Sequence, residues 1–136
     1  METQNLFNTR TLRGDLKKRA RVRKWIKALR SGDYKQGRRT LKKVRKSTER
    51  WCCLGVALDL LDPQGWLGPA LYAPNSTCHR LASGQGTARL GREAVSEFAL
   101  SKHANSILTV TNDTPGSSFK KIANLLETAY KVALKS

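Results

Sequence analysis

The segment over residues 51–61 is apolar on nearly every side of a helix, and only Gly55 and Asp59 interrupt it. A helix that is apolar all round is stable only where other elements surround it. The segment is therefore predicted to be the central, buried helix of the fold, ended by Asp62-Pro63. Gly55 costs about 1 kcal/mol of helix stability relative to Ala, so we expect another backbone to approach it closely.

Two further helices are predicted from single apolar stripes. Asp15 can cap a helix over residues 16–30, which Ser31-Gly32 ends, and Ser117 or Ser118 can cap a helix that closes the chain. In both, the apolar residues recur at the spacing of one helical face. The first stripe comprises Val22, Trp25, Ile26 and Leu29, and the second comprises Phe119, Ile122, Ala123, Leu126, Ala129, Tyr130 and Ala133.

Shorter elements are predicted for the rest of the chain. Residues 93–102 form a short helix with Val95, Phe98 and Ala99 inward, residues 112–116 a turn, and residues 83–87 a loop. Short strands are expected near 71–72 and 80–81, and a short strand or extended segment over 107–111. A helix or a short hairpin would both suit residues 38–50, for which a strand or irregular segment is favoured. The predicted fold is helix-rich α+β, with three main helices and a small irregular β portion. Residues 15–136 form one compact domain, and residues 1–14 form a flexible basic arm.

Positive charge is concentrated at one end of the chain. The sequence holds 26 Lys and Arg against 10 Asp and Glu, a net charge of +16. Residues 1–50 hold 18 basic and 4 acidic residues, a net +14, which leaves +2 for the remainder. Such self-repulsion opposes compaction, and a polyanion would relieve it by attraction and counterion release. We therefore predict that the first third binds nucleic acid or a ribonucleoprotein, since solubility alone does not require the charge to be concentrated.

The predicted contact residues lie in the arm, the first helix and the basic run over residues 38–50. Lys and Arg suffice to bind a phosphate backbone, and nothing in the pattern encodes base readout, so we expect backbone or shape recognition. Tyr34 and Trp51 flank the run and could stack on unpaired bases, with core packing as the alternative for both. The predicted nucleic-acid-binding residues are Arg10, Arg13, Lys17, Lys18, Arg21, Lys24, Arg38, Arg39, Lys42, Lys43, Arg45, Lys46 and Arg50.

The cysteines leave three interpretations open. A thiolate of Cys52 or Cys53 at the start of the central helix would have a lowered pKa and could act as a nucleophile. The same thiols could bind zinc, although adjacent ligands fit a tetrahedral site poorly. The simplest interpretation is that both are buried as small hydrophobic residues. The candidate base for the nucleophile is His79 or His103, oriented by Asn112 or Asp113, and the further candidate zinc ligands are Cys78, His79 and His103.

Several roles are not expected. The first residues are polar, and no apolar stretch approaches the ~18 residues that cross a bilayer, so we expect neither a signal peptide nor a membrane partner. An odd cysteine count is typical of a reduced, intracellular protein. We expect no cofactor, no metal and no enzymatic activity. Asp59 is expected to pair with an Arg, to cap a neighbouring segment or to face solvent.

Three segments of the chain form a recognisable series. They are Trp25-x2-Ala28-Leu29-x-Ser31-Gly32-x-Tyr34-x-Gln36, then Cys52-Cys53-Leu54-Gly55-Val56-x2-Asp59-Leu60, then Leu108-x3-Asn112-Asp113 followed by Phe119-x2-Ile122-Ala123-x3-Glu127. Together these segments resemble a family of small proteins encoded widely in bacteriophage genomes. They occur in the family's order, and the Cys-Cys-Leu-Gly segment is the most specific. The resemblance implies a phage or prophage origin, a helix-rich domain and action in the cytoplasm of a bacterial host. It implies no activity, and the family usually has an acidic or neutral linker where this chain has its basic run.

Three functional hypotheses follow. The first is a non-enzymatic, phage-type protein that binds nucleic acid or a ribonucleoprotein through its basic third. The second is a phage inhibitor that uses the same surface to bind an acidic host or defence protein. The third is a Cys-dependent enzyme, and a role as a virion component is also compatible with the sequence.

Overall fold

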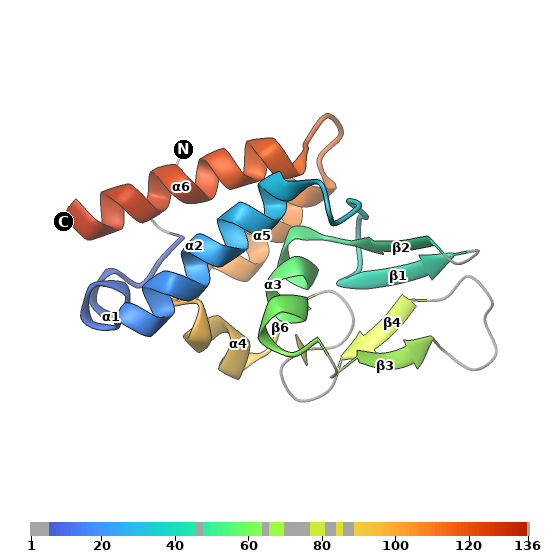
Figure 1. Cartoon of the computed structure of the whole chain (residues 1–136), viewed down its shortest axis with the longest axis horizontal. Helices are drawn as coiled ribbons and strands as arrows, with labels where there is room; N and C mark the ends of the chain where they lie inside the picture. The colour runs from blue at the N-terminus through green and yellow to red at the C-terminus, as the bar shows by residue number, and fades with distance from the viewer. Residues whose placement is uncertain are drawn as a thin grey trace.

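The chain folds around two long amphipathic helices and a shorter apolar one, with a small sheet at one end (Figure 1). The computed structural model describes residues 6–45, 48–63, 66–69, 77–80, 84–85 and 89–135. This arrangement confirms the predicted helix-rich α+β fold. The helices of the described residues are α1 (Thr9–Gly14), α2 (Leu16–Ser31), α3 (Cys53–Leu61), α4 (Arg92–Glu97), α5 (Ala104–Asp113) and α6 (Phe119–Lys135).

The described residues form two antiparallel sheets. Strands β1 (Lys42–Arg45) and β2 (Thr48–Trp51) form a hairpin, which confirms the strand prediction for the basic run. The hairpin continues into a four-stranded sheet of order β2-β1-β4-β3, with β3 at Trp66–Pro69 and β4 at Thr77–Arg80. Strands β5 (Gly84–Gln85) and β6 (Arg89–Leu90) pair separately. Residues 71–72 and 81, also predicted as strand, lie outside the described residues.

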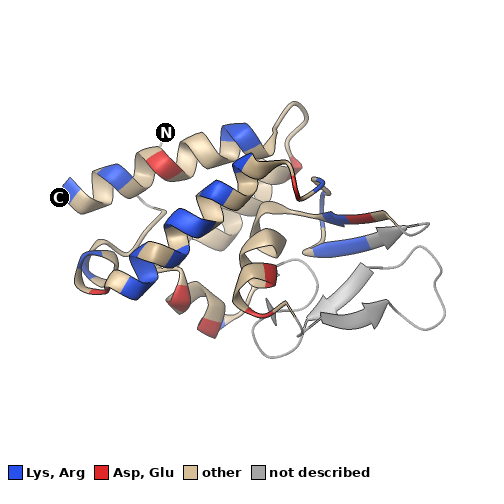
Figure 2. Cartoon of the chain, viewed as in Figure 1, with Lys and Arg blue, Asp and Glu red and all other residues tan. Residues whose placement is uncertain are grey.

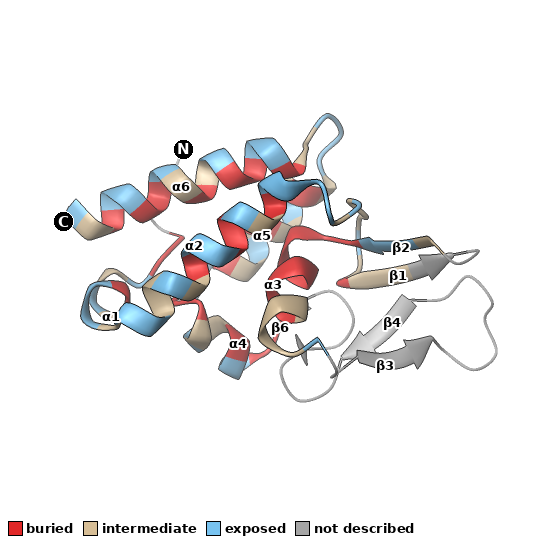
Figure 3. Ribbon diagram, viewed as in Figure 1, coloured by how far each residue is buried: buried red, intermediate tan, exposed pale blue. Residues whose placement is uncertain are grey.

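Helices α2 and α6 pack against each other along their predicted stripes, every residue of which is buried (Figure 3). Asp15 caps α2 as predicted, because its Oδ1 accepts the backbone N–H groups of Lys17 and Lys18 at 3.0 and 3.1 Å. The helix ends at Gly32, whose φ of +84° lies in the left-handed region that glycine adopts without strain. Ser118 caps α6 through its hydroxyl, as predicted.

Helix α3 is the central element, with residues 53–58 all buried. It contacts α2 and α5. Gly55 faces the backbone of Leu41, and a Cβ at this position would stand 1.8 Å from the Leu41 carbonyl oxygen. The same oxygen accepts the backbone N–H of Cys52 at 3.2 Å. The predicted close approach at Gly55 is confirmed, and it fixes the chain entering β1 onto the central helix.

Residues 6–14 are not a flexible arm, and that prediction is wrong for them. Leu6, Phe7 and Leu12 are buried in the core. The backbone of Asn8 donates to the Ala99 carbonyl at 2.7 Å, and Leu6 accepts from Ser101 at 2.9 Å. Burial of these three apolar side chains, together with the two backbone hydrogen bonds, offsets the conformational entropy lost when the segment is ordered. The segment therefore belongs to the domain.

The prediction of a strand over residues 107–111 is also wrong, because these residues lie in α5. Burial of Ala104, Leu108 and Asn112 at a spacing of four residues overrides the β preference of the branched side chains. The Thr111 hydroxyl donates to the Ile107 carbonyl at 2.7 Å inside the helix. Asn112 and Asp113 therefore end α5 instead of forming the predicted turn, which begins at Thr114.

The short helix predicted over residues 93–102 is instead α4, which ends at Glu97. Phe98 and Ala99 are buried as expected, and Ala99 adopts a left-handed φ of +51° that turns the chain out of the helix. Val95 packs against the core while remaining partly exposed. Because α4 ends at Glu97, the backbone at Leu100 is free to form an antiparallel bridge with Phe7.

Asn112 joins three parts of the fold through one fully buried amide. Its Oδ1 accepts from the backbone N–H of Cys53 at 3.1 Å and from Nε2 of Gln36 at 3.1 Å. Its Nδ2 donates to the Gly37 carbonyl at 2.9 Å. The amide thus ties α5 to the start of α3 and to the segment before the hairpin.

Replacement of Gly55 by Ala is expected to lower the free energy of unfolding by about 3 kcal/mol or more, because the new methyl group would overlap the Leu41 carbonyl. Gly14→Ala is the control, since no atom of the described residues lies within 4 Å of a Cβ there. Urea denaturation of both variants measures the difference. Equal stability of the two variants would contradict the packing described for α3.

Asn112→Ala is expected to cost roughly 3 kcal/mol of stability, because it leaves the Cys53 N–H and the Gly37 carbonyl without their partner. Asn124 on the exposed side of α6 provides the matched control, and Asn124→Ala should change stability by less than about 1 kcal/mol. Thermal unfolding followed by circular dichroism distinguishes the two. A mild effect at Asn112 would show that water or another group replaces the amide.

Candidate nucleic-acid interface

Helix α2 carries the densest positive charge of the described residues. Eight of its 16 residues are Lys or Arg and none is acidic. Because the apolar stripe packs into the core, the opposite side faces solvent along a length of about 24 Å. Figure 2 shows these basic residues along the whole helix. We call the exposed set the α2 outer face, and it comprises Lys17, Arg23, Lys24, Lys27 and Arg30.

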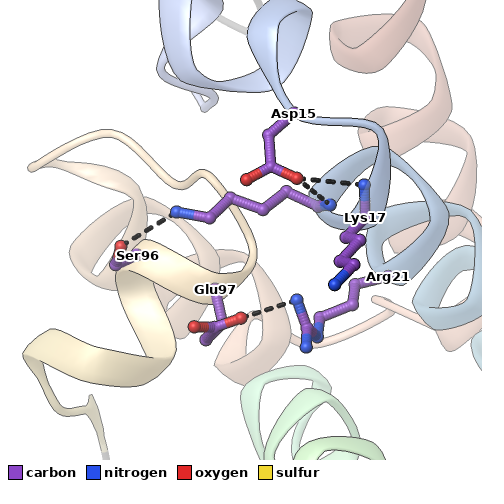
Figure 4. A network of polar contacts seen from close by, with 6 residues as sticks. Asp15, Lys17, Arg21, Ser96 and Glu97 are labelled. Carbon is purple, nitrogen blue, oxygen red and sulfur yellow. Dashed lines mark hydrogen bonds and ion pairs between the residues drawn. The ribbon is translucent and has the colours of Figure 1, made fainter.

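Two of the predicted contact residues on α2 are used instead to hold α4. Arg21 forms an ion pair with Glu97 at 2.6 Å, and Nζ of Lys18 donates to the Ser96 hydroxyl at 3.1 Å (Figure 4). Lys17 and Lys24 differ from them, since both are exposed and neither forms an ion pair with any described residue. The structure therefore separates the predicted set into tethered and available cations.

Arg10 and Arg13 lie on α1, which packs against α2. Both side chains are exposed. The carbonyl of Arg13 accepts from the guanidinium of Arg19 at 3.2 Å, so the end of α1 is held against the first turns of α2. These two cations are thus brought to the amino-terminal end of α2 on an ordered helix.

Several described cations of the basic run are held by contacts within the fold, one through an acid and two through neutral backbone carbonyls. Nζ of Lys42 lies 3.1 Å from Glu49 and 5.3 Å from the centre of the Trp51 ring. Arg50 and Arg38 donate to the carbonyls of Gln36 and Ser117 at 3.4 and 3.3 Å. Exposed Arg39 and half-buried Lys43 complete the described cations there. The side chain of Arg45, and Lys46 as a whole, lie outside the described structure.

Tyr34 and Trp51 are packing residues and not a platform for bases. Trp51 is only 9% exposed, and the Tyr34 ring meets it edge-on at 4.8 Å. The Tyr34 hydroxyl donates to Asp59 at 2.6 Å, and burial together with this carboxylate raises the pKa of Tyr34 well above its usual value. The predicted stacking role is not supported, and Asp59 is a partner of Tyr34.

Cys52 and Cys53 are buried at the start of α3. The Sγ of Cys52 accepts the backbone N–H of Gly55 at 3.4 Å and so caps the helix. The Sγ of Cys53 donates to the carbonyl oxygen of Leu108 at 3.7 Å. Burial raises the pKa of Cys52 to about 11 despite that hydrogen bond, and it raises the pKa of Cys53 well above its ordinary value. Thiols in this environment stay protonated at neutral pH, which favours the interpretation as small hydrophobic residues.

The other proposed partners of the cysteines are only partly described. His103 is exposed just before α5, whereas the side chains of Cys78 and His79 lie outside the described structure. Within the described ranges, no group of three His, Cys, Asp or Glu side chains is placed to hold a metal ion.

A groove between α2 and α6 brings together cations that the sequence-based prediction left out. It has a volume of about 410 Å³. The spacing of Arg23, Lys27 and Arg30 on the exposed side of α2 is the one sequence signal for this groove. Nothing in the sequence indicates that α6 supplies a fourth cation. The groove is lined by Arg23, Ile26, Lys27, Arg30, Glu127, Tyr130 and Lys131.

A larger hollow of about 770 Å³ lies between α5 and α6 and has a different character. Ile107, Val110 and Leu125 line it, and Lys121 is the single charged residue among the described residues of its wall. Nζ of Lys121 donates to the Gly116 carbonyl at 3.0 Å. A surface of this composition offers little to a polyanion, so the charged groove is the better candidate.

A family described as a domain of unknown function (DUF8296) matches residues 17–66, which run from α2 through the hairpin and α3 to the start of β3. No curated protein and no solved structure matches the chain. In the part of the chain that the structure describes, no helix is both long and apolar enough to cross a membrane.

Alkylation by iodoacetamide is expected to label native Cys52 and Cys53 at pH 8 about 100-fold more slowly than the same thiols in urea, since both are buried and protonated. The Cys78→Ser variant restricts the measurement to these two residues. The unfolded thiols ionise near pH 9, whereas native Cys52 does so only toward pH 11, so its native labelling rate should rise in that higher range. Fast labelling at neutral pH would restore the nucleophile hypothesis.

Proposed function

We propose that this protein binds nucleic acid, alone or within a ribonucleoprotein, through the α2 outer face and without catalysing a reaction. The observation that carries the proposal is a solvent-facing helix with eight cations and no acid, on which Lys17, Lys24 and Lys27 form no ion pair with any described residue. A polyanion would relieve the repulsion among these charges and release its own condensed counterions. Arg10 and Arg13 would extend the contact beyond the amino-terminal end of α2.

The expected mode is contact with the phosphate backbone. Helix α2 contains no Asn or Gln, the side chains that pair with adenine edges, and its exposed residues are mainly cations. Arg and Lys can also contact guanine, but a row of cations on one helix fits phosphates at many sequences equally. We therefore expect affinity that depends strongly on salt and weakly on base sequence.

The resemblance to small phage-encoded proteins adds a biological setting to this proposal. It would place the protein in the cytoplasm of a bacterial host during phage or prophage expression. The matched domain of unknown function covers α2, the hairpin and α3, the elements that carry and support the cations. An acidic host protein is the competing partner for the same surface, and nuclease treatment distinguishes it, because only a protein partner would stay bound.

Fluorescence anisotropy with a labelled oligonucleotide is expected to show binding at about 50 mM salt that weakens steeply as salt rises. If roughly six phosphates are contacted, log K should fall with log[salt] at a slope of about −5. Lys17→Glu combined with Lys24→Glu should reduce the slope by about two and the affinity by at least tenfold. Absence of binding by the wild type at this salt concentration would reject the proposal.

The control for this double variant is Lys102→Glu combined with Lys121→Glu, which changes the net charge equally at exposed positions outside α2, with Lys121 in the hollow between α5 and α6. Equal losses of affinity in the two double variants would show that binding depends on the total charge of the protein and not on the α2 outer face.

A further inference from the structure

The groove between α2 and α6 has an excess of positive charge at close quarters. Four described cations line it, and Glu127 is the single carboxylate among the lining residues that the structure describes. Glu127 is already engaged, since it lies 2.7 Å from Arg30 and 3.8 Å from Lys131. Hydrogen bonding and charge from Arg30 keep the pKa of Glu127 below its ordinary value, so this carboxylate stays ionised. Arg23 and Lys27 are left without an acidic partner among the described residues.

The two guanidinium groups in the groove are held in place before any ligand arrives. Arg23 donates to the Tyr130 hydroxyl at 2.8 Å, and Arg30 donates to Asn124 and Glu127, each at 2.7 Å. Positions 23 and 30 are seven residues apart, so the two side chains leave α2 on one side, about 10 Å apart along its axis. Anchored Arg side chains lose less conformational entropy on binding than free ones.

Tyr130 adds a neutral donor at the base of the groove. Its hydroxyl oxygen accepts from Arg23, while no described residue accepts the hydroxyl hydrogen. The ring is 8% exposed and Ile26 beside it is 6% exposed, so the base is apolar apart from this hydroxyl. An anion seated there would meet the phenol, Arg23 and Lys27 together.

We infer that the α2–α6 groove is a phosphate-binding site, in which a backbone phosphate of the bound nucleic acid contacts Arg23, Lys27 and the hydroxyl of Tyr130. The planar donors of Arg match the oxygens of a phosphate, and Lys adds charge without a fixed geometry. The inference rests on the proposed function for the identity of its ligand. A free phosphate compound would present the same chemistry to these residues.

The test compares the wild type with Lys27→Glu, with Tyr130→Phe and with the charge-matched control Lys102→Glu. Anisotropy with a labelled oligonucleotide and isothermal titration with inorganic pyrophosphate are measured for each, after circular dichroism has shown an unchanged fold. We expect Lys27→Glu to weaken both ligands at least tenfold and Tyr130→Phe, which keeps the ring, to weaken both about threefold, with Lys102→Glu near wild type. Pyrophosphate should also compete with the oligonucleotide.

The outcomes separate the two claims. Oligonucleotide binding that is equal in wild type, Lys27→Glu and Tyr130→Phe would overturn the groove and leave the proposed function standing. Pyrophosphate binding that Lys27→Glu abolishes, with no oligonucleotide binding by the wild type, would overturn the proposed function and assign the groove to a free phosphate compound. Failure of the wild type to bind either ligand would overturn both.

Discussion

The approach of Gly55 to the Leu41 carbonyl is the constraint on which much of this structure depends. Helix α3 is apolar on every side and must be enclosed, yet the chain that leads into the basic hairpin runs directly against it. A side chain at position 55 would separate the two backbones. With glycine there, the Leu41 carbonyl accepts the Cys52 N–H and the hairpin is joined to the core. The buried amide of Asn112 completes the joint from the side of α5.

The packing of α2 explains how a strongly basic segment can be part of a folded domain. Its apolar stripe is buried against α6 and α3, and the indole of Trp25 donates to the Cys53 carbonyl at 2.9 Å. Burial of four large side chains stabilises the helix enough to hold eight cations on one element. Of the eight cations on this helix, only Arg21 and Arg30 form an ion pair with a carboxylate of the described residues. The remaining repulsion is a cost to the free protein that binding to an anion would lower.

The fate of each predicted contact residue depends on what packs beside α2. Residues on the side facing α4 meet Glu97 and Ser96, so Arg21 and Lys18 become structural. Residues on the side facing α6 meet Tyr130 and Lys131, so Arg23 and Lys27 form part of a charged groove. Sequence spacing distinguishes inside from outside on a helix, but it does not identify the neighbours on either flank. This is why the prediction included Arg21 and Lys18 and left out Arg23 and Lys27.

The sequence by itself determined the helices that carry a continuous apolar pattern, together with their caps. The stripes of α2 and α6, the caps at Asp15 and Ser118, the all-apolar α3 and the close contact at Gly55 follow from local periodicity and from chain chemistry. Only the tertiary structure decided the rest, because short segments are governed by what buries them. Residues 6–14 are ordered by contacts near Leu100, and the branched residues of α5 are helical because Leu108 and Asn112 must face the core. The α2–α6 groove likewise exists only once two segments a hundred residues apart lie side by side.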